Sequence, residues 1–226
     1  MKNFLFSVLL LITFQMTLEA QHQMGIEIGP SFSNRNIQGD ADLLGTPETL
    51  TGVRTGLSYQ CDLNPVFSIQ SGFYYNMTGF KIIRGIDLDL FNIPVPANVR
   101  AITRIHFLEL PLLLRAEFGN DQVKAFIHAG PQISYAMDGD LLLRTRFLVD
   151  FNLGNYDINM SNSNFRQYEL AGVVGAGLNA KLNDRFYFKA GVDYMHGLTD
   201  LTKEPVINLS TTRYSVNTNI GLSYRF

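Results

Sequence analysis

Apolar and polar residues alternate with a period of two along most of this chain. In residues 213–226 the even positions from Tyr214 to Phe226 are mostly apolar, and the odd positions from Ser215 to Arg225 are small, polar or charged. This pattern predicts a β-strand with one apolar and one polar face. The same alternation recurs in seven earlier segments, which are residues 24–34, 52–62, 67–78, 104–118, 123–138, 168–181 and 186–196. The pattern therefore predicts eight strands.

The breaks between these strands alternate in length. Three are short and rich in Asn, Asp, Gly or Pro, at residues 63–65, 119–122 and 182–185. Four are long, at residues 35–51, 81–103, 139–167 and 197–212. Short turns on one side and long loops on the other are typical of bacterial transmembrane barrels. We therefore predict an all-β fold, an eight-stranded antiparallel up-and-down transmembrane β-barrel over residues 21–226, with both chain ends on the periplasmic side.

The apolar face is expected to contact lipid and the polar face to line the lumen. The interior of an eight-stranded barrel is just wide enough for side chains, and the apolar face is too rich in Phe, Tyr, Leu and Ile to fit there. A soluble lipocalin-like barrel is excluded on this ground. Pro111 lies within one strand and predicts a bulge or a locally broken ladder, because proline donates no ladder hydrogen bond.

The polar face also carries a balanced set of charges. The predicted lumen residues are Arg54, Arg115, Lys124, Lys181, Lys189, Arg225, Glu27, Glu109, Glu117, Asp138, Glu169 and Asp193. Unpaired charges are costly in a dry interior, so we expect them to pair across strands. With the large side chains of Tyr74, Phe107, Leu113, Phe126 and Tyr187 they predict a filled lumen without a wide channel. Outward aromatic residues near both strand ends predict two interfacial girdles.

Residues 1–20 predict a Sec signal peptide. Lys2 precedes an apolar run at 4–14, and the segment ends at Ala20, so the mature chain is expected to begin at Gln21. The run is shorter than the about 20 apolar residues of a spanning helix. A net charge of −2 gives no reason to expect nucleic acid as a partner. The single Cys61 cannot form an internal disulfide and is interpreted as an apolar strand residue.

Three segments resemble a known family. Phe-Leu-Glu-Leu-Pro-Leu-Leu-Leu-Arg at 107–115, Ala-Gly-Pro-Gln-Ile-Ser-Tyr at 129–135 and Tyr-Met-His-Gly-Leu-Thr-Asp at 194–200 are similar to recurring segments of the PorT-like outer-membrane β-barrel family of Bacteroidetes. The last strand, ending at Phe226, resembles the closing strand that the barrel assembly machinery reads. The resemblance implies the bacterial outer membrane as location, with outer-membrane lipid and the assembly machinery as partners.

Candidate catalytic and metal-binding residues are few. His22, His106, His128 and His196 lack metal-ligand spacing, so no metal, cofactor or catalytic site is predicted. The acids Asp87, Asp89, Asp138 and Asp140 are interpreted as solvated loop residues rather than a calcium site. The segment Gly-Ala-Gly-Leu-Asn-Ala at 175–180 formally fits a dinucleotide fingerprint but is predicted to lie within a strand, which excludes that function.

The sequence predicts a non-enzymatic, monomeric barrel with a structural or binding role through its extracellular loops. The apolar segments 88–95 and 141–143 are interpreted as extensions of strands or as a partner surface. One alternative is a lipid-modifying barrel enzyme, because His106 and His196 have outward parity near the loops, with Ser134 and Thr199 as candidate nucleophiles. The other alternative is an accessory component of a type IX-like secretion apparatus, which only the family resemblance implies.

Overall fold

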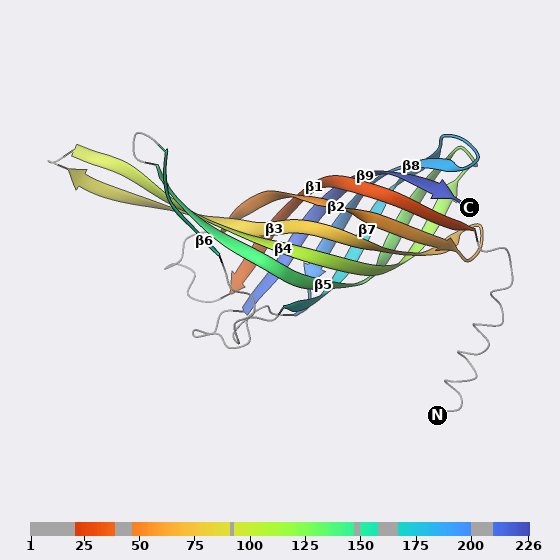
Figure 1. The fold of residues 1–226 in the computed structure, drawn as a ribbon, viewed down its shortest axis with the longest axis horizontal. Coiled ribbons are helices and arrows are strands. Elements are labelled where there is room, and N and C mark those ends of the chain that lie inside the picture. Colours follow the sequence, from red (N-terminus) through yellow and green to blue (C-terminus); the bar gives the residue numbers. More distant parts are fainter. Residues whose placement is uncertain (1–20, 39–46, 91–92, 147–149, 158–166, 200–209) are drawn as a thin grey trace, which may run out of the picture.

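The protein is built from antiparallel β-strands (Figure 1). The computed structural model describes residues 21–38, 47–90, 93–146, 150–157, 167–199 and 210–226, so the predicted signal peptide lies outside the described residues. The strands are β1 (His22–Gln38), β2 (Pro47–Asp62), β3 (Phe67–Leu90), β4 (Ile93–Gly119), β5 (Val123–Arg146), β6 (Asp150–Asp157), β7 (Tyr168–Lys181), β8 (Phe186–Gly197) and β9 (Ser210–Arg225). Among the described residues, no helix has the length and apolarity to cross a membrane.

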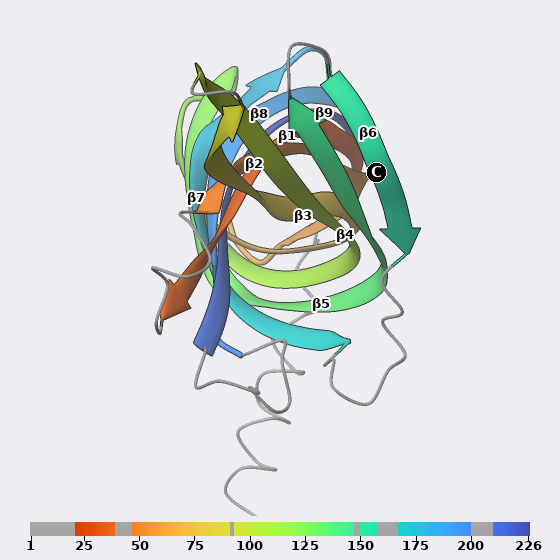
Figure 2. The same cartoon turned by 90° about the vertical axis from the view of Figure 1, so that its left-hand side faces the viewer.

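Eight of these strands form a closed ring (Figure 2). Their order is β4-β3-β2-β1-β9-β8-β7-β5, and a further pairing of β4 with β5 closes the barrel. The first strand pairs with the last, from Gln23 opposite Arg225 to Gln38 opposite Ser210. The predicted eight-stranded antiparallel barrel is confirmed. β6 is an additional strand that pairs with the end of β5, from Asp140 to Arg146.

The two faces of the barrel wall are those that the alternation predicts. Along β1 the side chains of Gln23, Glu27 and Ser31 are buried, whereas Ile26 is 65 % exposed. The exposed apolar residues form an outward belt around the barrel, and the buried polar residues line the lumen. Outward aromatic residues contact each other near both ends, Tyr135 with Tyr168 in a tilted arrangement and Phe186 with Tyr224 edge to face.

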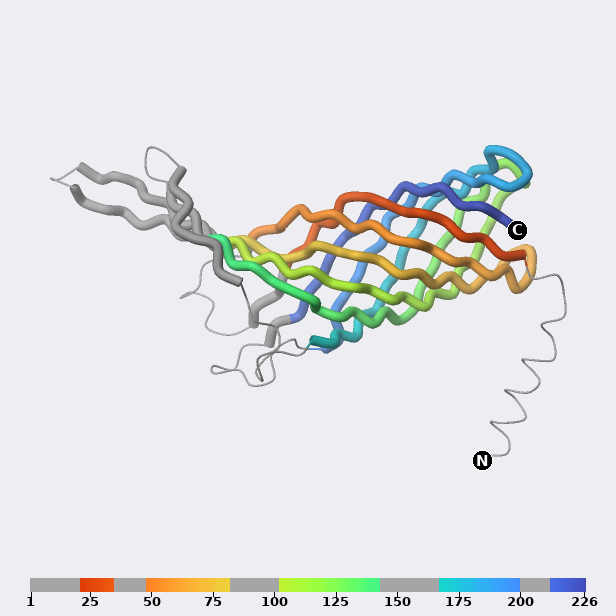
Figure 3. Tube along the Cα trace, viewed as in Figure 1, coloured from red at the N-terminus to blue at the C-terminus, as the bar shows by residue number. Residues whose placement is uncertain are grey.

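The three short turns share one stabilising contact. The side-chain oxygens of Asn64, Asn120 and Asn183 each accept hydrogen bonds from the backbone N–H groups two and three residues further on, at 2.8–3.0 Å. An Asx turn of this kind fixes a tight connection between antiparallel strands. These turns and the carboxyl terminus lie at the same end of the barrel, here called the turn end (Figures 1 and 3).

A β-bulge in β5 reverses the predicted faces beyond it. The pairing of β4 with β5 passes from His106 opposite Asp138 to Phe107 opposite Ala136, so Met137 is an extra residue. Ala136 and Gly139 are therefore both buried, and Asp138 is exposed. The predicted lumen position of Asp138 is wrong, because one inserted residue moves every later side chain to the other face.

Two prolines break the ladder around the middle of β4. The pairing of β3 with β4 omits Gly72–Phe73 opposite Leu110–Pro111 without a change of register, and the Ser71 hydroxyl donates to the Pro111 carbonyl at 2.8 Å. The locally broken ladder predicted at Pro111 is confirmed. On the other side of β4, the pairs of Leu112–Leu113 with Gly130–Pro131 are also missing.

The β3–β4 hairpin continues beyond the closed ring. β2 pairs with β3 only as far as Pro47 opposite Ile82, whereas β3 and β4 pair up to Leu90 opposite Ile93. Segments 88–95 and 141–143 thus extend strands, apart from residues 91–92 outside the described part. The predicted long connection at 81–103 is in fact mostly strand.

Phe226 closes the seam between the first and last strands. Its N–H donates to the His22 carbonyl at 3.0 Å, its carbonyl accepts from the His22 N–H at 3.4 Å, and its ring stacks on that of His22. Deleting Phe226 is expected to reduce the amount of folded barrel in the membrane strongly, because the seam loses its last pair. Deleting Leu201, in the connection after β8, is the control. Quantitative blotting of heat-modifiable protein in outer-membrane fractions measures both, and equal amounts contradict this expectation.

Candidate functional site

The lumen is filled by ion pairs and aromatic rings. Near the turn end, the Arg115 guanidinium donates to Glu117 at 2.9 Å and to Gln70 at 3.0 Å, and it lies 3.5 Å from the centre of the Phe126 ring. The Gln60 amide and the Lys124 ammonium also approach Glu117, at 3.1 and 3.6 Å. This cluster, which we call the turn-end layer, spans several strands of the barrel.

A central layer connects six strands. Arg54 on β2 donates to Glu109 on β4 at 3.0 Å and lies 3.7 Å from Asp193 on β8. Asp193 contacts His128 on β5 at 2.9 Å. The Tyr74 ring lies 3.7 Å from the Arg54 guanidinium, and its hydroxyl donates to Glu27 at 3.1 Å. His128 is therefore part of the lumen filling, paired with a carboxylate.

The layer towards the long connections is organised by Arg213, which is 2 % exposed. Its Nη2 lies 2.7 Å from Glu169 and 3.5 Å from Glu109, and its guanidinium covers the Phe107 ring at 4.1 Å. Glu169 is 1 % exposed, and neither of its oxygens accepts a hydrogen bond from a described residue. The pair is held by charge at short distance, without hydrogen-bond alignment.

Arg213 was absent from the predicted lumen charges, although its odd position places it on the polar face of the last strand. Two predicted lumen lysines, Lys124 and Lys181, lie at the barrel rim with 29 % and 28 % of their side chains exposed. Lys181 donates to Asp184 in the adjacent turn at 2.8 Å, and this hydrogen bond lowers the pKa of the Asp184 carboxyl from its ordinary value. Pairing across strands is confirmed for Arg54 with Glu109 and for Lys189 with Glu27. Arg115 instead pairs with Glu117 within β4, Arg213 joins the lumen charges, and Asp138 is not among them.

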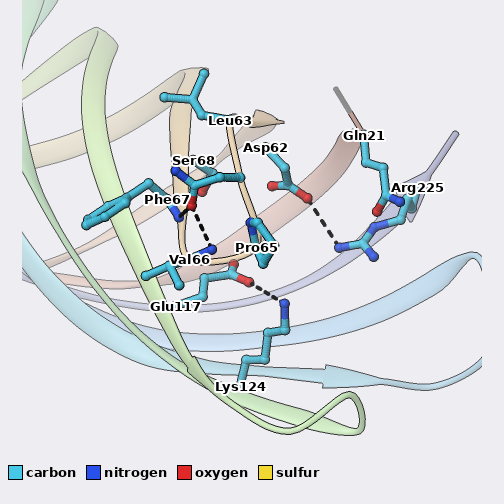
Figure 4. Close-up of a pocket in the computed structure, with 11 residues that line it drawn as sticks. Gln21, Asp62, Leu63, Pro65, Val66, Phe67, Ser68, Glu117, Lys124 and Arg225 are labelled. Atoms are coloured by element: carbon cyan, nitrogen blue, oxygen red, sulfur yellow. Dashed lines mark hydrogen bonds and ion pairs between the residues drawn. The ribbon is translucent and has the colours of Figure 1, made fainter. Parts of the chain in front are cut away.

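A pocket of about 480 Å³ opens at the turn end of the lumen (Figure 4). One wall carries the pairs Asp62–Arg225, at 3.4 Å, and Glu117–Lys124, at 3.6 Å. The β2–β3 turn from Leu63 to Phe67 forms the other wall. Glu117 belongs both to this pocket and to the turn-end layer. The pocket therefore ends at that layer, where side chains fill the lumen.

A second polar cluster lies on the outer face. The Tyr75 hydroxyl is 2.6 Å from His106 Nδ1, and His106 Nε2 is 3.4 Å from Asp140 Oδ1. The rings of Tyr75 and His106 stack at 5.8 Å. The alternation places His106 on the outer face, where it lies, but it does not reveal Tyr75 and Asp140 as its partners. Asp140 faces outward because of the bulge at Met137, which the alternation does not show.

The other candidate residues do not form such a cluster. Ser134 is fully buried in the lumen, where Arg213 donates to it at 3.4 Å, so it lies on the wrong face to serve His106. The Thr199 hydroxyl accepts from the Leu170 N–H at 3.0 Å. His196 contacts the Tyr194 hydroxyl at 3.4 Å on the outer face.

The remaining candidates are the acids and the glycine segment. Asp87 and Asp89 lie in β3, where their side chains are outside the described ones. Among the described residues no group of three or more His, Cys, Asp or Glu side chains could hold a metal ion. Segment 175–180 lies within β7, as expected, and opens no helix.

A family model described as "Outer membrane protein beta-barrel domain" matches residues 19–203. No curated protein matches the chain significantly. Among solved structures, Neisserial surface protein A is 13 % identical, with a TM-score of 0.44 over 90 % of this chain and 97 % of that one. OprG from Pseudomonas aeruginosa is 14 % identical, with a TM-score of 0.47 over 90 % and 95 %. The outer membrane protease OmpT from Escherichia coli is 10 % identical, with a TM-score of 0.38 over 94 % and 100 %. These likenesses are distant, and none bears on what this chain does.

Proposed function

Because the chain belongs to the outer membrane protein β-barrel domain family, we propose that it is a closed barrel of the bacterial outer membrane with a structural or binding role. The filled lumen supports this proposal most directly. Arg54, Arg115 and Arg213 each lie over an aromatic ring and beside a carboxylate, at successive levels of the interior. Binding would then fall to the long connections and the β3–β4 extension, which we place outside the cell.

The finer PorT-like assignment and an accessory role in secretion remain proposals that rest on the sequence segments. Two of these segments lie side by side in the wall, since Leu110 of the first pairs with Ile133 of the second. Affinity purification from solubilised membranes would test the accessory role. Recovery of secretion-apparatus subunits with the tagged barrel would support it, and recovery of the barrel without them would contradict it.

The closed lumen predicts that the purified barrel forms no steady channel. Eight strands enclose an interior that side chains fill, whereas porins with an aqueous channel have about 16–18 strands. Planar-bilayer recording of the folded protein is expected to show no sustained nanosiemens conductance, with a general porin in the same bilayer as positive control. Rare small openings are compatible with the filling by ion pairs. A steady conductance of nanosiemens size from single barrels would contradict the closed lumen.

A lipid-modifying enzyme is the second candidate, favoured by the contacts of Tyr75, His106 and Asp140. Against it, both ring nitrogens of His106 already contact Tyr75 and Asp140, and the candidate nucleophile Ser134 is buried in the lumen. We expect His106→Gln to leave the lipid A species of the host unchanged by mass spectrometry, as His196→Gln should. A change in lipid A species with His106→Gln alone would favour the enzyme.

A further inference from the structure

The outward residues of β4 and β5 change from uncharged to ionisable along the length of the strands. Those on β4 from Leu108 to Phe118 and on β5 from Ala125 to Tyr135 are uncharged. Towards the long connections, four ionisable outward residues follow within a few positions, namely Arg104, His106, Asp138 and Asp140. An outward Arg or Lys costs about 2–4 kcal/mol at the bilayer midplane and about 0–1 kcal/mol near the interface. These four residues therefore mark the level of the lipid head groups.

The bulge at Met137 is what brings this cluster together. Without the inserted residue, Asp138 and Asp140 would point into the lumen, whereas they now face outward opposite His106 and Arg104. Bulges commonly re-aim a side chain next to a functional site. Asp140 then lies 3.4 Å from His106, while the shielded Nε of Arg104 has no hydrogen-bond partner among the described residues. The patch thus presents two basic and two acidic groups, beside the Tyr75 hydroxyl.

Further along the same strands, the outer wall is recessed. A groove of about 290 Å³ is lined by apolar residues of β3, β4 and β5, among them Leu112, Leu114, Ala129 and Pro131. The recess forms because the short residues at 129–131 lie beside the exposed side chains of Leu112 and Leu114, where the ladder between β4 and β5 is broken. Leu113 packs on its other side against Ala171, Val173 and Met195 in the lumen. The groove is therefore apolar throughout and closed from behind.

The separation of cluster and groove fits half a bilayer. Leu112 lies six residues from His106 along β4, which is about 20 Å at about 3.3 Å per residue. With a strand tilt of about 40°, this corresponds to about 15 Å of depth. The hydrocarbon core is about 30 Å thick, so one leaflet is about 15 Å. The cluster at head-group level and the groove at the bilayer midplane therefore lie on the same outer face of β3–β5, one leaflet apart.

We propose that the outer face of β3–β5 binds a single lipid, with its head at the cluster around His106 and one acyl chain in the groove. The basic and acidic residues of the cluster determine which lipid head group can bind. The Arg104 guanidinium suits a phosphate, and the Asp138 and Asp140 carboxylates suit an ammonium group. The ligand class is therefore a lipid whose head carries both phosphate and ammonium, either an ethanolamine phospholipid or a lipid A bearing phosphoethanolamine. This site goes beyond the proposed function and depends only on membrane insertion, not on the closed lumen.

Native mass spectrometry of the purified barrel tests this proposal. The protein is exchanged into detergent with phosphatidylethanolamine, with phosphatidylglycerol, or with lipid A with and without phosphoethanolamine. We expect one copy of an ammonium-bearing lipid to be retained preferentially, and the two ammonium-bearing arms identify its source. Arg104→Gln is expected to weaken retention about tenfold, the loss of one charge-assisted contact. Equal retention of phosphatidylglycerol, or no effect of Arg104→Gln, overturns the assigned head.

The groove is tested by filling it. Ala129→Phe is expected to abolish retention of the lipid, because the ring occupies the recess. Ala176→Phe is the matched control, since Ala176 is an exposed outward alanine on β7, opposite Ile127 and outside the groove lining. Ala129→Leu serves as a milder second variant if the first does not fold, as judged by heat-modifiable mobility. Equal retention by the variants at positions 129 and 176 overturns the acyl-chain assignment.

Discussion

Replacing Arg213 with Met is expected to lower the free energy of unfolding by about 3–5 kcal/mol. Breaking a buried ion pair by removing one partner leaves an uncompensated charge in the interior, which costs about this much. The stranded charge is Glu169, which is 1 % exposed and has Arg213 as its ion partner at 2.7 Å. Glu109 contributes less to the loss of stability, because it keeps its contacts with Arg54 at 3.0 Å and with the Asn76 amide at 2.9 Å. Urea titration of the barrel in phospholipid vesicles measures the loss.

A second substitution tests whether the stranded charge is the cause. Adding Glu169→Gln to Arg213→Met removes that charge, so most of the lost stability should return. Lys181→Met breaks an exposed pair with Asp184 at the rim and serves as control, with little change expected. If the double variant is no more stable than Arg213→Met alone, the loss comes from packing on the Phe107 ring rather than from Glu169.

Replacing Gly56 with Val is expected to destabilise the barrel by about 3 kcal/mol or more, the upper end of overpacking costs. Gly56 pairs with Tyr74 across β2 and β3. A Cβ atom at this position would lie 2.3 Å from the Phe73 carbonyl oxygen and 2.7 Å from the Tyr74 ring. Both the wall and the ring that covers Arg54 must then shift.

Gly172 offers a matched control for this substitution. A Cβ atom added there meets no atom within 4 Å, and the residue also lies in a barrel strand. Gly172→Val should therefore fold with nearly unchanged stability in the same urea titration. Equal losses at both positions would show that the loss at Gly56 does not come from the close approach to Phe73 and Tyr74.

Much of the fold was predictable because a lipid environment enforces strict alternation. Wherever one face contacts lipid, as in β1, β7 and β9, the sequence placed both faces correctly. The bulge at Met137 was not visible, since Met-Asp-Gly-Asp reads equally well as continued alternation. The sequence predicts a loop for the hairpin extension, because a strand beyond the membrane needs no apolar face, although its two strands are neighbours in sequence that meet at Leu90 opposite Ile93.

The candidate sites were less predictable, because they depend on contacts between strands. His106 had the right parity, but its partners Tyr75 and Asp140 come from two other strands and from a change of register. Arg213 lies at the edge of the last alternating segment, where the sequence does not show whether the strand has already begun. The three lumen layers could be predicted as a set of balanced charges, but the pairing of Glu169 with Arg213 required the register of β7 and β9.

The two prolines near the start of β4 restrict where a foreign strand can add to the β3–β4 extension. Pro94 and Pro96 lie opposite Asp89 and Asp87, within an unbroken ladder with β3. Their nitrogens therefore point away from β3, towards the edge of β4 that no described strand covers between residues 93 and 97. An edge without amide hydrogens is a poor template for edge-to-edge aggregation. A neighbouring chain that approaches this hairpin thus finds a continuous row of donors and acceptors only along β3.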